Sequence, residues 1–96
     1  MKRVLVINNF VRDDYAADFD RSILRSFSGT HANVRIVRMV DLDTIGPTDG
    51  YTHLVLSGSE ASAIDDHPWN EPLETFIRNW VGTGRPLLGI CYGHHF

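Results

Sequence analysis

The sequence predicts an α/β protein in which a mostly parallel sheet carries helices on both faces. Short apolar segments of strand length alternate along the chain with longer segments whose apolar residues recur at helical spacing. This alternation is typical of consecutive β–α–β units, whose strands run parallel. No linker, internal repeat or low-complexity segment divides the 96 residues, so one domain is expected.

The first predicted strand covers residues 3–8 and leads into a helix. Asp13 or Asp14 can cap that helix, which is expected to run to about Ser28 and to stop at Gly29. Its apolar residues share one face, which should pack on the sheet. They are Tyr15 or Ala16, Phe19, Ile23, Leu24 and Phe27.

Two further strands are predicted in the middle of the chain, over residues 33–40 and 52–56. Between them, Gly46-Pro47 and Asp49-Gly50 indicate a loop. A second helix should open at Glu71 or Pro72 and end at Gly82 and Gly84, before a fourth strand over residues 86–90. Its buried stripe is expected to be Leu73, Phe76, Ile77, Trp80 and Val81.

The fourth strand delivers the only cysteine, Cys91, to a turn flanked by Gly89 and Gly93. A sharp turn from strand to helix exposes a nucleophile, and the glycines leave room for strand and helix to pack closely. The amino end of a following helix stabilises a thiolate and lowers the thiol pKa from its free value of about 8.5. A lone cysteine after an apolar strand is otherwise an inert core residue. The flanking glycines favour the nucleophile.

Residues 86–94, PLLGICYGH, resemble the nucleophile elbow of class I glutamine amidotransferases. The usual form of that elbow is Gly-x-Cys-x-Gly-His-Gln after a Pro-Ile/Leu-Leu-Gly strand. Ser57-Gly58-Ser59 resembles the turn, commonly Ser-Gly-Gly, that supplies the family's oxyanion hole. A weaker likeness lies in residues 7–10, which resemble the Asp-Asn-Phe/Tyr ending of the family's first strand.

The resemblance implies a flavodoxin-like, three-layer α/β fold, of which residues 1–96 would form the N-terminal part. A parallel sheet covered on both faces usually needs more chain than this. We therefore expect an incomplete domain. The C-terminal part, with the His-x-Glu pair that completes a Cys-His-Glu triad in the family, would be absent from these residues, and they alone should be inactive.

The resemblance also implies hydrolysis of L-glutamine to glutamate and ammonia through a Cys91 thioester. Backbone N–H groups of Tyr92 and of the Gly58–Ser59 turn would bind the oxyanion. A synthase domain or subunit would receive the ammonia, and no cofactor is implied. Two positions depart from the family: His95 replaces the glutamine associated with substrate binding, and Ser59 replaces the second glycine of the turn.

Other interpretations stay open. A related cysteine hydrolase, such as a γ-glutamyl peptidase, would release glutamate without channelling ammonia, and a catalytically silent relative would bind or regulate. The adjacent His94 and His95 do not predict a metal site, because consecutive helical side chains point in different directions. No carboxylate or cysteine spacing accompanies them either.

Composition narrows the partners and the compartment. The formal net charge is -3 and the nine Lys and Arg residues are spread among acidic ones, so no nucleic acid is expected as a partner. No apolar run approaches the roughly 18 to 20 residues that cross a bilayer, so no membrane partner is expected. A single cysteine makes no internal disulfide, which favours the reducing cytoplasm.

Overall fold

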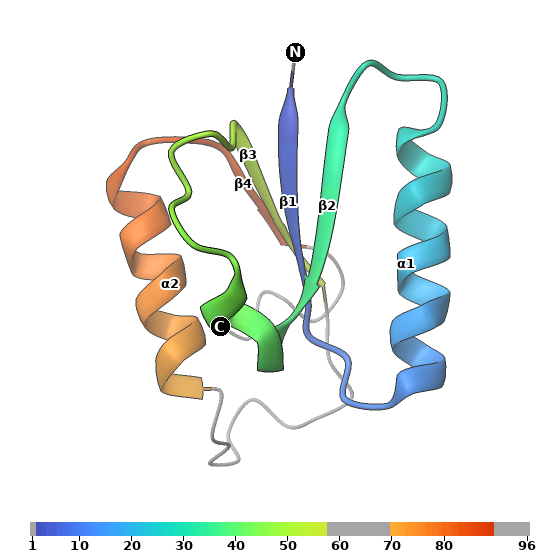
Figure 1. Cartoon of the computed structure of the whole chain (residues 1–96), viewed down its shortest axis with the longest axis horizontal. Coiled ribbons are helices and arrows are strands. Elements are labelled where there is room, and N and C mark those ends of the chain that lie inside the picture. The colour runs from blue at the N-terminus through green and yellow to red at the C-terminus, as the bar shows by residue number, and fades with distance from the viewer. Residues whose placement is uncertain (1, 58–69, 90–96) are drawn as a thin grey trace.

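The computed structural model describes residues 2–57 and 70–89, drawn in colour in Figure 1. Within them, parallel strands form one sheet in the order β2-β1-β3-β4. The strands are β1 (Arg3–Asn8), β2 (Asn33–Arg38), β3 (His53–Leu56) and β4 (Leu87–Gly89). The predicted α/β class and the parallel sheet are confirmed.

Side chains of the central strand β1 alternate between two apolar cores. Leu5 and Ile7 pack in a core that includes residues of helix α2 (Asn70–Gly82). Val4 and Val6 pack on the other face with residues of helix α1 (Asp13–Phe27). Figure 1 shows the two helices on opposite sides of the sheet. Burial of each such side chain stabilises the fold by about 1.5–3 kcal/mol.

Helix α1 starts and stops close to the predicted residues, but its cap differs. The N-cap residue is Arg12, whose side chain makes no capping hydrogen bond. Capping by Asp13 or Asp14 is therefore wrong, since both carboxylates lie in the first turn, near the positive end of the helix dipole. The helix ends at Phe27, and Gly29 adopts a φ of 81°, the left-handed conformation that ends helices.

The predicted apolar stripes of both helices are too wide. In α1 the buried residue of the first turns is Ala16, whereas Tyr15 is exposed. Leu24 is 54% exposed and Val81 in α2 is 57% exposed, so their predicted packing on the sheet is wrong. Each directly follows a buried residue of its stripe, and its side chain therefore points about 100° away around the helix.

Strand β2 ends earlier than predicted. The chain turns after Arg38 into a short 3-10 helix, η1 (Met39–Thr44), with a kink at Asp41. Met39 packs into the core of the α2 face, but Val40 is 65% exposed. Met39 and Val40, the last residues of the predicted strand, therefore belong to a turn that buries the side chain of Met39 alone.

Candidate functional site

The carboxyl end of the sheet contains the point at which the strand order reverses. From β1 the chain passes to β2 on one side and then to β3 on the other, so β1 separates these two strands. In open α/β sheets, ligands bind outside the carboxyl ends of the strands at such a switch point. The edge between the ends of β1 and β3 is therefore the place where this topology favours a site.

Three buried polar residues lie at this edge. Asn8 ends β1, Asn9 follows it, and Ser57 follows β3. Each is 0% exposed, and they are the buried polar residues of the described chain. Because a buried polar group costs free energy unless it is hydrogen-bonded, each must find partners inside the protein.

Asn8 joins β1 to α1. Its Nδ2 donates to the carbonyl oxygen of Ala16 at 2.9 Å and to Oδ1 of Asp20 at 2.7 Å. Its Oδ1 accepts from the backbone N–H of Phe10 at 3.1 Å. These bonds hold the strand against the helix that follows it, so Asn8 is a structural joint.

Asn9 and Ser57 join the end of β1 to the end of β3. The backbone N–H of Asn9 donates to Oγ of Ser57 at 2.6 Å, and Nδ2 of Asn9 donates to the carbonyl oxygen of Ser57 at 3.1 Å. The backbone N–H of Ser57 donates to the carbonyl oxygen of Ile7 at 3.0 Å. We call this arrangement the Asn9–Ser57 junction. From it the chain leaves both strands.

Arg38 ties the loop after β1 to the end of β2. Its guanidinium donates to the carbonyl oxygens of Phe10 at 3.0 Å and Val11 at 3.1 Å, and pairs with the carboxylate of Asp13 at 3.1 Å. The β1–α1 loop is therefore held from two sides, by Asn8 within and by Arg38 from the neighbouring strand.

Of the residues predicted for catalysis, the structure describes Gly89. It ends β4 and pairs in register with Leu56 of β3. The other predicted residues lie outside the described part of the chain. They are Gly58, Ser59, Cys91, Tyr92, Gly93 and His95.

Sequence reasoning did not identify the Asn9–Ser57 junction. Asn9 entered only through a weak family likeness, and Ser57 only as part of a turn. A signal was present, because amides at the end of an apolar run, residues 4–7, lie at a buried strand end and must find partners. The partner could not be inferred, since it lies 48 residues away along the chain.

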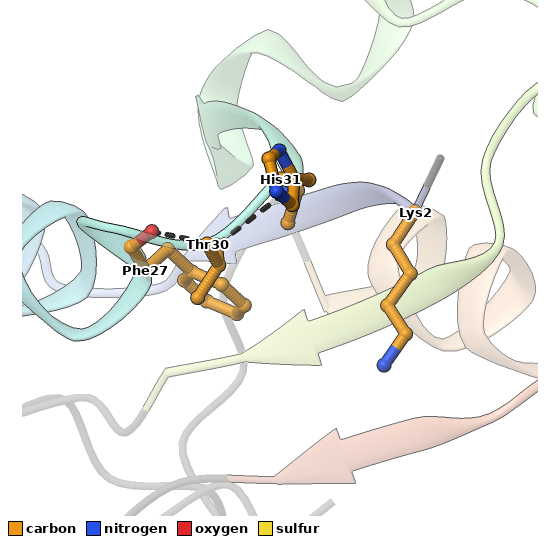
Figure 2. Close-up of a pocket in the computed structure, with 5 residues that line it drawn as sticks. Lys2, Phe27, Thr30 and His31 are labelled. Atoms are coloured by element: carbon orange, nitrogen blue, oxygen red, sulfur yellow. Dashed lines mark hydrogen bonds between the residues drawn. The ribbon is translucent and has the colours of Figure 1, made fainter.

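A surface hollow of about 540 Å³ lies at the opposite, amino end of the sheet (Figure 2). It is lined by Lys2, Phe27, Thr30, His31 and Ala32. The hydroxyl of Thr30 is used locally, donating to the carbonyl oxygen of Phe27 at 2.6 Å. The hollow contains none of the predicted site residues and does not bear on the predicted nucleophile.

In residues 2–57 and 70–89, no three His, Cys, Asp or Glu side chains gather closely enough to hold a metal ion. No helix in this same part of the chain has both the length and the apolar character that crossing a bilayer requires.

The chain matches no protein-family model, no curated protein and no solved structure. The function is therefore inferred from the fold, from the geometry of the switch point and from the sequence motifs at the ends of β3 and β4.

Proposed function

We propose that the chain is part of a class I glutamine amidotransferase in which Cys91 hydrolyses L-glutamine through a thioester. The strand order supports the fold that this family resemblance implies. The order β2-β1-β3-β4 agrees with the first four strands of the flavodoxin-like arrangement 2-1-3-4-5. In that arrangement the ligand lies at the switch point between the first and third strands.

The observation that carries the proposal is the register between β3 and β4. Leu56 pairs with Gly89, so the two strands end side by side at the same edge. Gly58 and Ser59 follow Leu56 by two and three residues, and Cys91 follows Gly89 by two. Each is within about 7–11 Å of chain from a paired residue. An oxyanion donor and a nucleophile starting from these ends can reach one carbonyl group.

The chemistry would run in two steps. The Cys91 thiolate adds to the side-chain carbonyl carbon of glutamine, and the oxyanion is bound by the N–H of Tyr92 and one from the Gly58–Ser59 turn. Collapse breaks the C–N bond, and the leaving nitrogen takes a proton and departs as ammonia. Water then hydrolyses the thioester to glutamate and restores the thiol. The family's His-x-Glu pair, outside these residues, would move the protons.

A cysteine hydrolase acting on γ-glutamyl peptides is the second candidate, and His95 in place of the family's glutamine favours it. Both candidates use Cys91 in the same way and differ in the group that leaves, ammonia or a peptide amine. The first also needs a synthase to receive the ammonia. For either candidate we propose the cytoplasm, because a nucleophilic thiol persists in a reducing compartment.

The test is an assay of the intact protein with L-glutamine and, separately, with a γ-glutamyl dipeptide, measuring glutamate and ammonia. We expect glutamate and ammonia in equal amounts from glutamine, and no product above buffer from Cys91→Ala. Ser26→Ala is the control variant, since Ser26 lies exposed on α1 and its hydroxyl bonds only the carbonyl of Ser22. Hydrolysis that survives in Cys91→Ala, or no glutamate from either substrate, would refute the proposal.

A second measurement addresses the thiol itself. The rate of Cys91 alkylation by iodoacetamide, followed against pH, should report a thiol pKa below the free value of about 8.5. A value at or above that of a free thiol would mean that Cys91 is not activated.

A further inference from the structure

At the switch point, side chains replace a backbone bond of the sheet. The last backbone bond between β1 and β3 runs from Ser57 N–H to the carbonyl oxygen of Ile7. In a regular parallel ladder the next bond would run from Asn9 N–H to the carbonyl oxygen of Ser57. Here Asn9 N–H instead donates to Ser57 Oγ, and Asn9 Nδ2 donates to that carbonyl.

This exchange ends the backbone ladder between β1 and β3 while the N–H of Asn9 and the carbonyl of Ser57 stay hydrogen-bonded. The main chain of β1 turns away at Asn9 toward α1, and the carbonyl of Ser57 is still satisfied by the amide side chain. The backbone groups at this end of β1 are therefore bonded at the carboxyl edge of the sheet. That edge is where ligands of doubly wound sheets bind.

The amide of Asn9 has a fixed orientation in the junction. Rotating it by half a turn would set its oxygen against the carbonyl oxygen of Ser57, so Nδ2 must face that carbonyl. Its Oδ1 is buried and has no hydrogen-bond partner among the described residues. Keeping a buried acceptor unpaired is unfavourable, which indicates that this side chain is held for its contacts with Ser57.

We propose that Asn9 is a positioning residue: it holds Ser57, and thereby sets the direction in which the chain leaves β3 toward the oxyanion turn. This inference rests on the proposed function. Oxyanion donors act only when they lie about 2.7–3.1 Å from the developing charge. Misplacement by about 1 Å can cost about 100-fold in rate, so the junction should control kcat without contacting substrate.

Asn8 provides a matched control for this role. It is the same residue type, equally buried and adjacent in sequence, but its three hydrogen bonds go to Ala16, Asp20 and Phe10 and none goes to β3. Asn8→Ala should therefore lower stability through the β1–α1 joint and leave Ser57 in place.

The kinetic experiment compares Asn9→Ala, the similarly sized Asn9→Leu and Asn8→Ala in the intact protein, at a temperature where all are folded. Both Asn9 variants should lower kcat for glutamine by about 10- to 100-fold with little change in KM. Asn8→Ala should leave kcat nearly unchanged. Ser57→Ala should resemble Asn9→Ala, and Ser57→Thr, which keeps the hydroxyl, should recover part of the rate. Equal losses of kcat in the Asn8 and Asn9 variants would overturn the inference.

Amide hydrogen exchange gives a readout that does not depend on glutamine hydrolysis. Asn9→Ala should speed exchange at the Ser57 amide about five- to thirtyfold, the factor for losing one to two kcal/mol of local stability. Asn8→Ala should speed it less. If exchange changes as expected but the wild type hydrolyses no glutamine, the proposed function fails, and so does positioning for that reaction. Unchanged exchange at Ser57 would overturn the junction's role whatever the activity.

Discussion

The β2 edge of the sheet carries two arginines that bind backbone carbonyls, whereas the described β4 edge carries only Leu87, Leu88 and Gly89. Arg35 on β2 donates to the Tyr51 hydroxyl at 2.9 Å and to nearby carbonyls, and Arg38 holds the β1–α1 loop. Charged side chains on an edge strand oppose its pairing with other chains. The β4 strand has no such residue.

A second contrast separates β4 from its neighbour β3. Val55 of β3 and Leu88 of β4 lie in register, so their side chains point to the same face of the sheet. Val55 is 4% exposed because it packs in the core of the α1 face, while Leu88 is 58% exposed. The two side chains are both apolar, so coverage by a helix, and not side-chain type, explains the different exposure of Val55 on β3 and Leu88 on β4. Three predictions test the difference between the β2 and β4 edges, from the largest expected effect to the smallest.

The β2 edge should be sensitive to replacement of Arg38. In Arg38→Ala the carbonyls of Phe10 and Val11 and the carboxylate of Asp13 lose this donor. We expect the free energy of unfolding to fall by about 1.5–3 kcal/mol, the range for hydrogen bonds to a charged group, measured by urea denaturation. Arg21→Ala is the control, because Arg21 is exposed and pairs only locally with Asp18. It should change stability by less than about 0.5 kcal/mol. Similar losses in both variants would contradict a special role for Arg38.

The segment that leads into β4 should depend on Arg85 for its stability. Its guanidinium lies 4.0 Å from the centre of the Trp80 ring and donates to the carbonyl oxygens of Thr48 at 2.6 Å and Tyr51 at 2.5 Å. Lysine cannot reproduce this forked geometry, so Arg85→Lys should lower the free energy of unfolding by about 0.5–1.5 kcal/mol. Arg78→Lys, at an exposed pair with Glu74, should have almost no effect. If Arg85→Lys left the free energy of unfolding unchanged, the contacts of Arg85 with Thr48 and Tyr51 would not stabilise the fold.

Substitution on β4, the edge strand of the described sheet, should affect association more than stability. Leu88→Lys places a charge on an exposed residue of β4, and should alter the free energy of unfolding by no more than about 0.5 kcal/mol. It should also weaken any concentration-dependent self-association, measured by sedimentation velocity, since a lysine on an edge opposes strand pairing. Val40→Lys changes an apolar, 65% exposed residue of η1, outside the strands, and should leave association as in the wild type. Equal association of the wild type, Leu88→Lys and Val40→Lys would contradict the inference that β4 is the edge at which chains associate.

Local patterns in the sequence were sufficient for most of the elements. The predicted first strand coincides with β1, because an apolar run that ends in polar residues marks a strand buried on both faces. The stop of α1 was readable from Gly29, since a positive φ favours glycine. The exposure of Leu24 and Val81 could not be predicted from the sequence, because it depends on the width of the sheet surface that each helix covers.

The candidate site also has a part that the sequence predicted and a part that it did not. Its chemistry was inferred from a motif around Cys91 and from the Ser57-Gly58-Ser59 turn, and the parallel sheet brings the strands before them to one edge. The role of Asn9 was not inferred, although its position after an apolar strand was plain. The catalytic assignment of Cys91 stays a prediction.

The sequence by itself determined the order of the strands and of the two α-helices, because side-chain periodicity and glycine positions act on the backbone locally. Only the tertiary structure decided the strand order β2-β1-β3-β4 and the switch point at the end of β1. It also decided which polar groups meet: Asn9 with Ser57 across 48 residues, and Arg85 with Thr48 across 37. Such pairs form because buried donors and acceptors must find partners wherever the packed sheet and helices place them.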